Sequence, residues 1–137
     1  MKKIGVLGCG WLGMALAKKA IEKGYSVNAT STTPSKILRL ESTQINPFLL
    51  EVNESEIKGE DLFFNDISTL IITIPPRLRK NTNLNFNKII DQVITKIKDF
   101  KIKKVIFLSS TSVYGFQEEE INEESPTLGT TTSAIQL

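Results

Sequence analysis

Short apolar runs alternate along the chain with segments whose apolar residues repeat at helical spacing. The apolar runs have the length of buried β-strands and occupy residues 3–7, 25–30, 48–52, 69–74 and 104–108. The segments with helical spacing lie between the runs and occupy residues 11–23, 34–41 and 85–100. Strands that alternate with helices in this way predict an α/β fold of Rossmann type, with a doubly wound parallel sheet of about five strands and helices on both faces.

The helical segments carry recognisable signals at their ends. The first ends before Gly24, which suits the position just after a helix C-terminus. The second follows Thr33 and Pro34, a pair typical of the N-cap and the first helical position. The third has the clearest apolar stripe, formed by Phe86, Ile89, Ile90, Val93, Ile94, Ile97 and Phe100. Residues 53–65 have no clear pattern, and a short helix there is compatible with the sequence.

The first apolar run leads directly into Gly8-Cys9-Gly10-Trp11-Leu12-Gly13, hereafter the glycine turn, which opens the first helix. This placement is typical of a turn that binds the pyrophosphate of a dinucleotide. Gly8 permits the tight turn, Gly10 lets the pyrophosphate approach the backbone, and Gly13 lets the helix pack closely on the sheet. The helix N-terminus supplies N–H groups to the phosphates. We expect Trp11 and Leu12 to contribute too, with Trp11 packing either over the cofactor or against a neighbouring loop.

The end of the second apolar run decides which dinucleotide is expected. An NAD-binding site usually has Asp or Glu here to bind the ribose hydroxyls, but this chain has Thr30, Ser31 and Thr32. Hydroxyls can donate hydrogen bonds to a 2′-phosphate, and Lys36 or Arg39 can add positive charge. The sequence therefore favours NADP(H), with NAD(H) still possible. Alternatively, the residues after Thr32 simply begin a helix and the two cations are solvated.

The carboxyl ends of parallel strands meet at one edge of a sheet, so the segments that follow them should line one crevice. The fourth apolar run is followed by Pro75 and Pro76, and the fifth by Ser109. We therefore expect Ile74, Pro75, Pro76 and Ser109 to contribute to the cofactor site together with the glycine turn.

The composition excludes several other kinds of site. The chain of 137 residues contains no histidine, which removes histidine-based acid–base catalysis and His-ligated zinc, and we expect no metal site. Its one cysteine cannot form an intrachain disulfide, which is compatible with the cytoplasm. A net charge of +2 gives no support for nucleic-acid binding. No apolar stretch approaches the roughly 20 residues of a membrane span.

Three stretches carry a resemblance to a known family. They are the glycine turn, Ile74-Pro75-Pro76, and Ser109-Ser110-Thr111-Ser112-Val113-Tyr114-Gly115 with the later Glu124-Ser125-Pro126. In this order they resemble the extended short-chain dehydrogenase/reductase superfamily, and most of all its atypical members described as NAD-dependent epimerase/dehydratases. The resemblance covers nearly the whole chain. It implies the NAD(P)-binding domain of an oxidoreductase or epimerase-like protein that acts on a small molecule.

The resemblance also assigns roles to particular positions. It implies that Ser110 hydrogen-bonds a substrate oxygen, whereas the alternative is that Ser110 and its neighbours satisfy their own loop backbone. The family's catalytic tyrosine and lysine are expected just after Pro126, where the aligned positions hold Ser133 and Leu137. Tyr114 belongs to the loop after the last strand and is not that tyrosine. Thr111 and Ser112 stand where dehydratases have acidic residues, so dehydration is not expected.

Two further functional hypotheses remain beside that of an oxidoreductase or epimerase-like protein. Without the tyrosine–lysine pair, the chain could be a regulatory module that senses a nucleotide and has lost catalysis. A hydroxyacid-type dehydrogenase, such as those acting on phosphogluconate, shares the glycine turn but is disfavoured by residues 109–115. We expect residues 1–137 to be the cofactor half of a longer protein. A sheet stopped after five strands would leave apolar surface exposed and favour self-association.

Overall fold

A computed structural model describes residues 2–59, 61–75, 83–116, 120–131 and 134–135 of the chain. It divides into two compact units, Met1–Ile74 with Lys88–Leu108, and Pro75–Asn87 with Ser109–Leu137. The first unit contains the sheet and the glycine turn. The second contains the segment that follows the last strand. No helix within the described ranges is both long enough and apolar enough to cross a membrane.

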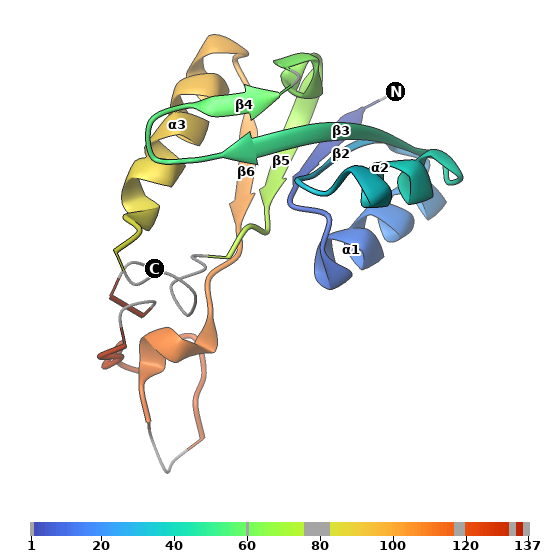
Figure 1. Ribbon diagram of the computed structural model, residues 1–137. Helices are drawn as coiled ribbons and strands as arrows, with labels where there is room; N and C mark the ends of the chain where they lie inside the picture. Colours follow the sequence, from blue (N-terminus) through green and yellow to red (C-terminus); the bar gives the residue numbers. More distant parts are fainter. Residues whose placement is uncertain (1, 60, 76–82, 117–119, 132–133, 136–137) are drawn as a thin grey trace. The chain divides into compact units, whose positions relative to one another are not determined.

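The sheet has six strands in the order β4-β3-β2-β1-β5-β6 (Figure 1). Their bounds are β1 Lys3–Leu7, β2 Ser26–Ser31, β3 Ile45–Val52, β4 Ile57–Gly59, β5 Ile67–Ile72 and β6 Lys104–Phe107. All neighbouring strands are parallel except β3 and β4, which are antiparallel. From β1 the chain adds strands first on one side and then on the other, which is the doubly wound arrangement. The expected Rossmann-type fold class is confirmed, although the short strand β4 was not predicted.

Three α-helices connect the described strands. Helix α1 (Trp11–Glu22) follows β1, α2 (Pro34–Glu41) follows β2, and α3 (Phe86–Asp99) precedes β6. Two short 3-10 helices, η1 (Asp61–Phe64) and η2 (Thr111–Tyr114), precede β5 and follow β6. Helix α1 ends at Glu22 with Lys23 as its C-cap, and Gly24 follows with a φ of +84°, so the expected glycine stop is confirmed. Thr33 occupies the predicted N-cap position of α2, but its side chain makes no capping hydrogen bond.

Two apolar clusters occupy opposite faces of the sheet, because successive residues of a strand point to opposite sides. Val6 belongs to the cluster that contains Ala17 of α1 and Leu40 of α2. Its neighbour Leu7 belongs to the other cluster, which contains Val93 of α3 and both phenylalanines of η1. Helices therefore cover both faces, as the alternation of strands and helices predicted.

Several strand boundaries differ from the prediction by one to three residues, and two of them bear on the site or the sheet. β3 begins at Ile45, three residues earlier than expected, and so contains Pro47. Pro47 is tolerated because β4 pairs only with Leu50–Val52, which leaves the first part of β3 paired on one side alone. β5 ends at Ile72 rather than at Ile74. Thr73 and Ile74 therefore leave the ladder and lie beside the glycine turn.

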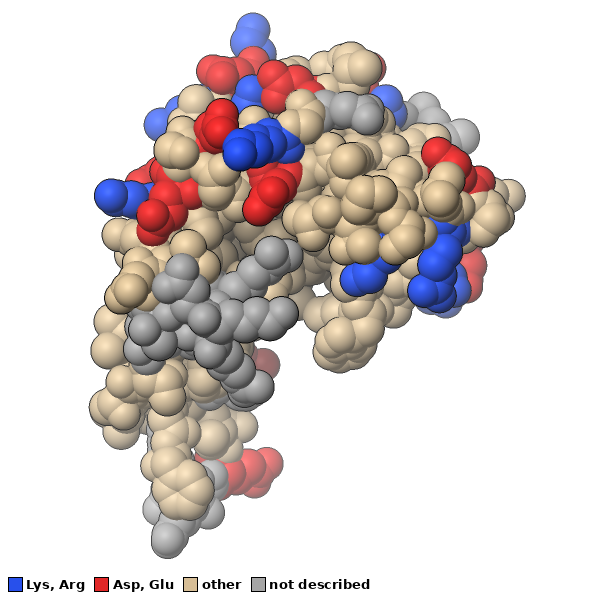
Figure 2. Space-filling model, in the orientation of Figure 1, with Lys and Arg blue, Asp and Glu red and all other residues tan. Residues whose placement is uncertain are grey.

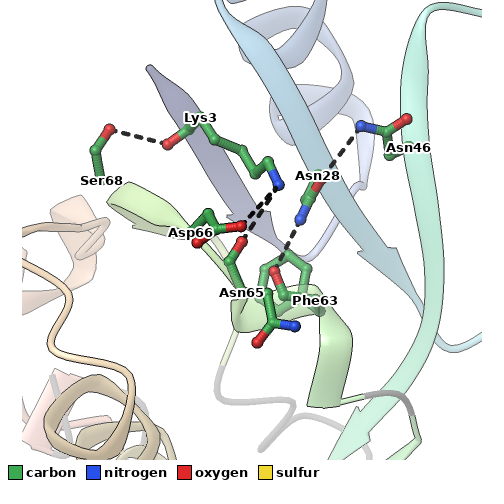
Figure 3. Close-up of polar contacts among 7 residues, drawn as sticks. All are labelled: Lys3, Asn28, Asn46, Phe63, Asn65, Asp66 and Ser68. Atoms are coloured by element: carbon green, nitrogen blue, oxygen red, sulfur yellow. Dashed lines mark hydrogen bonds and ion pairs between the residues drawn. The ribbon is translucent and has the colours of Figure 1, made fainter. Parts of the chain in front are cut away.

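Polar side chains attach the η1 segment to the middle of the sheet (Figure 3). The buried Asn28 of β2 donates a hydrogen bond from Nδ2 to the carbonyl oxygen of Phe63 at 3.0 Å. Asn46 of β3 donates to Asn28 Oδ1 at 3.3 Å, and Lys3 of β1 donates to the carbonyl oxygen of Asn65 at 3.4 Å. These contacts satisfy buried polar groups, whose burial without partners would be costly, and they fix a segment that has no clear sequence pattern.

Candidate functional site

The glycine turn begins where β1 ends. Gly8 has a φ of +103°, a conformation that side-chain-bearing residues rarely adopt. A Cβ built on Gly8 would lie 2.9 Å from both Ile74 Cγ2 and Thr73 Oγ1. Backbone conformation and lack of space therefore both require glycine here, as the sequence predicted for a tight turn out of the strand.

The other two glycines of the turn have opposite surroundings. A Cβ on Gly13 would lie 2.3 Å from the carbonyl oxygen of Gly8, so α1 can approach the turn only because Gly13 has no side chain. A Cβ on Gly10 would have no described atom within 4 Å. No packing inside the described chain explains Gly10, whereas an open approach for a ligand does.

The first turn of α1 faces this open space at Gly10. Gly10 is the N-cap, and the first helical hydrogen bond runs from the Met14 N–H to the Gly10 carbonyl oxygen at 2.9 Å. The backbone N–H groups of residues 11–13 have no helical partner for geometric reasons. Such N–H groups, together with the helix dipole, form the usual anion site of a dinucleotide-binding turn. The side chain of Trp11 is 87% exposed.

The hydroxyl residues at the end of β2 are mostly used by the backbone. Thr30 is only 2% exposed, and its Oγ1 accepts a hydrogen bond from the Gly8 N–H at 2.9 Å. Ser31 is 8% exposed, and its Oγ accepts from the Thr33 N–H at 3.1 Å. Thr32 is exposed. Of the three residues expected to reach a 2′-phosphate, only Thr32 therefore has an exposed side chain.

Lys36 lies on α2 close enough to the glycine turn to act on it electrostatically. Burial raises the pKa of the Cys9 thiol, and the positive charge of Lys36 partly opposes that rise. The side chain of Lys36 is exposed. In Figure 2, Lys and Arg side chains lie over the α1 and α2 part of the surface with acidic side chains beside them, and side chains of both signs are also interspersed over α3 and β4.

Thr73 is a residue of the site that the sequence analysis missed. It follows β5, and its N–H donates to the Leu7 carbonyl oxygen at 3.0 Å. Its Oγ1 hydroxyl lies 3.0 Å from the same oxygen and also donates to the carbonyl oxygen of Gly8. The available signal was that Thr73 is a hydroxyl residue near the end of the fourth apolar run, directly before Ile74 and two prolines. Ile74 itself packs against the core, and its Cγ2 limits the space at Gly8.

The remaining predicted site residues belong to the second unit. Pro75 is exposed, and Pro76 lies outside the described residues. Ser110 is the N-cap of η2, and its Oγ accepts a hydrogen bond from the Ser112 N–H at 3.2 Å. The structure thus contains the hydrogen bond expected if Ser110 satisfies the backbone of its own loop. Its hydroxyl proton is not used in that bond and can still be donated.

Ser109 borders a hollow of about 430 Å³ within the second unit. The hollow is lined by Ser109, Val113, Thr127, Gly129, Ala134 and Ile135. The chain passes close to itself here, since the Gly129 N–H donates to the Val113 carbonyl oxygen at 2.8 Å. Ser133 and Leu137, which stand at the expected tyrosine and lysine positions, lie outside the described residues.

Comparison with known families and proteins finds a family match and curated relatives. The model of the family described as "NADP oxidoreductase coenzyme F420-dependent" matches residues 3–81, which include the glycine turn and β5. "Protein YeeZ" of Escherichia coli strain K12 is 30% identical over 128 residues, which are 92% of this chain and 47% of that protein. The chain thus spans about half the length of the curated relatives it matches.

Solved structures share the fold of the chain. A UDP-galactose 4-epimerase superposes with a TM-score of 0.72 at 20% identity, covering 98% of this chain and 47% of its own. A UDP-N-acetylglucosamine 4-epimerase from Bacillus cereus gives 0.74 at 14% identity, covering 99% and 45%. At these identities the likeness establishes the Rossmann-type fold. Both matches extend past residue 81 and include residues 109–115, which the family match does not reach.

Proposed function

This chain belongs to the family described as NADP oxidoreductase coenzyme F420-dependent, and from that premise we propose that its glycine turn binds NADP(H) in preference to NAD(H). The chain is then the cofactor-binding part of an oxidoreductase. When bound, the nicotinamide would supply a hydride acceptor or donor. The part played by this chain is to bind the pyrophosphate and the adenosine end and to hold them in place.

The open space at Gly10 is the observation that carries the proposal. Gly8 and Gly13 are required by contacts within the chain, but Gly10 is not. The N–H groups of the first turn of α1 face this space, and they suit a pyrophosphate, which carries negative charge. A side chain at Gly10 would fill the place where the phosphates approach. The residues present therefore fit a dinucleotide.

The preference for NADP(H) rests on charge at the end of β2. β2 ends in Thr30 and Ser31, so no carboxylate stands there to repel a 2′-phosphate. Thr32 and Lys36 are exposed. The positive charge of Lys36 acts to lower the pKa of Cys9 within the turn, so Lys36 lies near the turn. A charged hydrogen bond to phosphate contributes about 1.5–3 kcal/mol. Lys36 is therefore proposed to bind the 2′-phosphate, with Thr32 beside it.

Titration with NADPH and NADH, followed through the emission of Trp11, tests this proposal, because Trp11 is the single tryptophan of the chain. Lys36→Ala should weaken NADPH binding by roughly 10- to 100-fold and change NADH binding less than twofold. Lys18→Ala removes an equal charge from an exposed position of α1 and should leave both unchanged. Equal loss of both nucleotides in Lys36→Ala would contradict the assignment, and absence of binding to the folded wild-type chain would refute the function.

We further propose that the whole protein is of the extended short-chain dehydrogenase/reductase type and epimerase-like. The support is the motif at residues 109–115 and the shared fold of the sugar-nucleotide epimerases over nearly all of this chain. In this proposal Ser110 donates its hydroxyl proton to a substrate oxygen. Ser110→Ala should lower turnover of the longer protein, whereas cofactor affinity should stay within twofold.

A second candidate is a regulatory module that binds the nucleotide without turning it over. The observation that favours it is the presence of Ser133 and Leu137 where the resemblance expects tyrosine and lysine. Neither side chain can exchange a proton near neutral pH in the way that a tyrosine assisted by lysine does. Saturable NADPH binding by the longer protein, with no oxidation of NADPH across a panel of carbonyl compounds, would favour this candidate over the enzyme.

A further inference from the structure

We infer that Thr30 and Thr73 are positioning residues that hold the peptide groups of Gly8, and that Thr30 does not bind the 2′-phosphate. The inference rests on the proposed function only in that the turn they hold is the cofactor turn. Both positioning roles are inferred from hydrogen bonds within the first unit. Thr73 was not among the expected site residues, and Thr30 was expected in a different role.

Thr30 holds the amide side of Gly8. Its Oγ1 accepts from the Gly8 N–H at 2.9 Å, and its carbonyl oxygen accepts from the Cys9 N–H at 2.8 Å. Two successive N–H groups of the turn are thus bound to one residue of β2. With 2% of its surface exposed, Thr30 has little access to a ligand. Its hydroxyl oxygen is used to fix the backbone.

Thr73 holds the carbonyl side of Gly8. Its hydroxyl donates to the Gly8 carbonyl oxygen, and the Leu7 carbonyl oxygen lies 3.0 Å from the same Oγ1. The Thr73 N–H binds the Leu7 oxygen as well, at 3.0 Å. The backbone hydrogen bond from the Thr73 N–H to Leu7 of β1 therefore holds the Thr73 hydroxyl in place. Gly8 is bound from β2 on one side and from the end of β5 on the other.

This double attachment matters because Gly8 determines where α1 begins. The Gly8 carbonyl oxygen is the atom that a Cβ on Gly13 would meet at 2.3 Å, so Gly8 and the first turn of α1 are in close contact. A glycine at φ +103° has no side chain to restrict its backbone. If the threonine hydroxyls are removed, the Gly8 peptides lose their partners, and the N–H groups of the first turn lose their fixed position.

The two roles of Thr30 predict different patterns of nucleotide binding. NADPH and NADH share the pyrophosphate and differ by the 2′-phosphate. A positioning residue therefore affects both nucleotides by the same factor, whereas a 2′-phosphate ligand affects NADPH alone. Thr73 lies at the end of β5, and removal of its hydroxyl should also affect both nucleotides equally.

The experiment compares Thr30→Val and Thr73→Val with Thr30→Ser and Thr73→Ser in titrations with NADPH and NADH. Each Val variant should weaken both nucleotides by the same factor, about tenfold, which is the effect of about 1.4 kcal/mol. The Ser variants keep the hydroxyl and should stay within threefold of the wild type. Thr95→Val is the matched control, because Thr95 also donates to a backbone carbonyl oxygen but is exposed on α3; it should change neither affinity.

Amide hydrogen exchange of the wild-type chain keeps the inference testable if a Val variant fails to fold. The Gly8 and Cys9 amides should be protected without nucleotide, and the Trp11 and Leu12 amides should exchange rapidly until NADPH is added. Rapid exchange of the Gly8 amide overturns the inference. Val variants that bind both nucleotides with wild-type affinity also overturn it. So does a Thr30→Val variant that binds NADPH more weakly but NADH normally. A wild-type chain that is folded, protected at Gly8 and unable to bind either nucleotide refutes the proposed function but supports the threonine contacts.

Discussion

Replacement of Gly13 by alanine tests the close approach of α1 to the glycine turn. The new Cβ would lie 2.3 Å from the Gly8 carbonyl oxygen and 3.2 Å from Val6 Cγ1. A carbon and a carbonyl oxygen normally approach no closer than about 3.3 Å. The backbone of the turn and that of the helix must therefore separate by about 1 Å, because the obstructing atom belongs to the backbone and cannot rotate away.

The cost in stability is the difference between two opposing effects. Forcing a methyl group into packed space costs about 1–3 kcal/mol, whereas replacing glycine by alanine inside a helix contributes up to about 1 kcal/mol in favour of folding. We expect Gly13→Ala to lower the free energy of unfolding by about 1–2 kcal/mol. For a chain of this size that corresponds to a fall in Tm of roughly 3–10 °C, measurable by circular dichroism.

The cost in binding should be larger than the cost in stability. A shift of about 1 Å takes an N–H···O hydrogen bond of about 2.9 Å beyond hydrogen-bond length. Losing one hydrogen bond to phosphate costs about 1.5–3 kcal/mol, so NADPH should bind at least tenfold more weakly in a Trp11 fluorescence titration. Gly10→Ala is the comparison, because its Cβ meets no described atom of the chain. It should abolish NADPH binding and change Tm little.

The outcome that would refute this reasoning is a Gly13→Ala chain with the Tm and NADPH affinity of the wild type. In that case the turn and α1 accommodate a side chain without moving the phosphate-binding N–H groups. A Gly10→Ala chain that binds NADPH normally would separately show that the phosphates do not approach at Gly10.

Three further predictions concern other parts of the first unit. Asn28→Ala leaves the buried carbonyl oxygen of Phe63 without its 3.0 Å partner and should lower the free energy of unfolding by about 1–3 kcal/mol in urea titrations; an unchanged midpoint would contradict the anchoring role. Because burial raises the pKa of Cys9, the unfolded chain releases the thiol proton first, so stability should fall as pH rises above about 8.5; Cys9→Ala should remove that part of the pH dependence, and identical profiles would refute it. Val105 and Ile106 of the edge strand β6 are each 41% exposed, so the chain should self-associate through this strand, and Ile106→Lys should reduce the mass measured by light scattering.

The sequence by itself determined the fold class and the position of the glycine turn. Both depend on local patterns: apolar runs of strand length, helical stripes such as that of α3, and a glycine spacing in which each residue has its own steric reason. Gly24 stops α1 because its left-handed conformation is a local property of glycine. Such features can be read without knowing what packs against them.

Tertiary structure decided which hydroxyl residues stabilise the turn and which face solvent. Thr30, Ser31 and Thr32 are equivalent in sequence, but Thr30 and Ser31 are the last two residues of β2 and are buried, whereas Thr32 lies past the end of the strand and is exposed. No local pattern connects Thr73 with Gly8, because their hydrogen bond spans 65 positions and exists only where β5 lies beside β1. Burial and strand pairing are long-range properties. They separate the residues that shape the site from those exposed to a ligand.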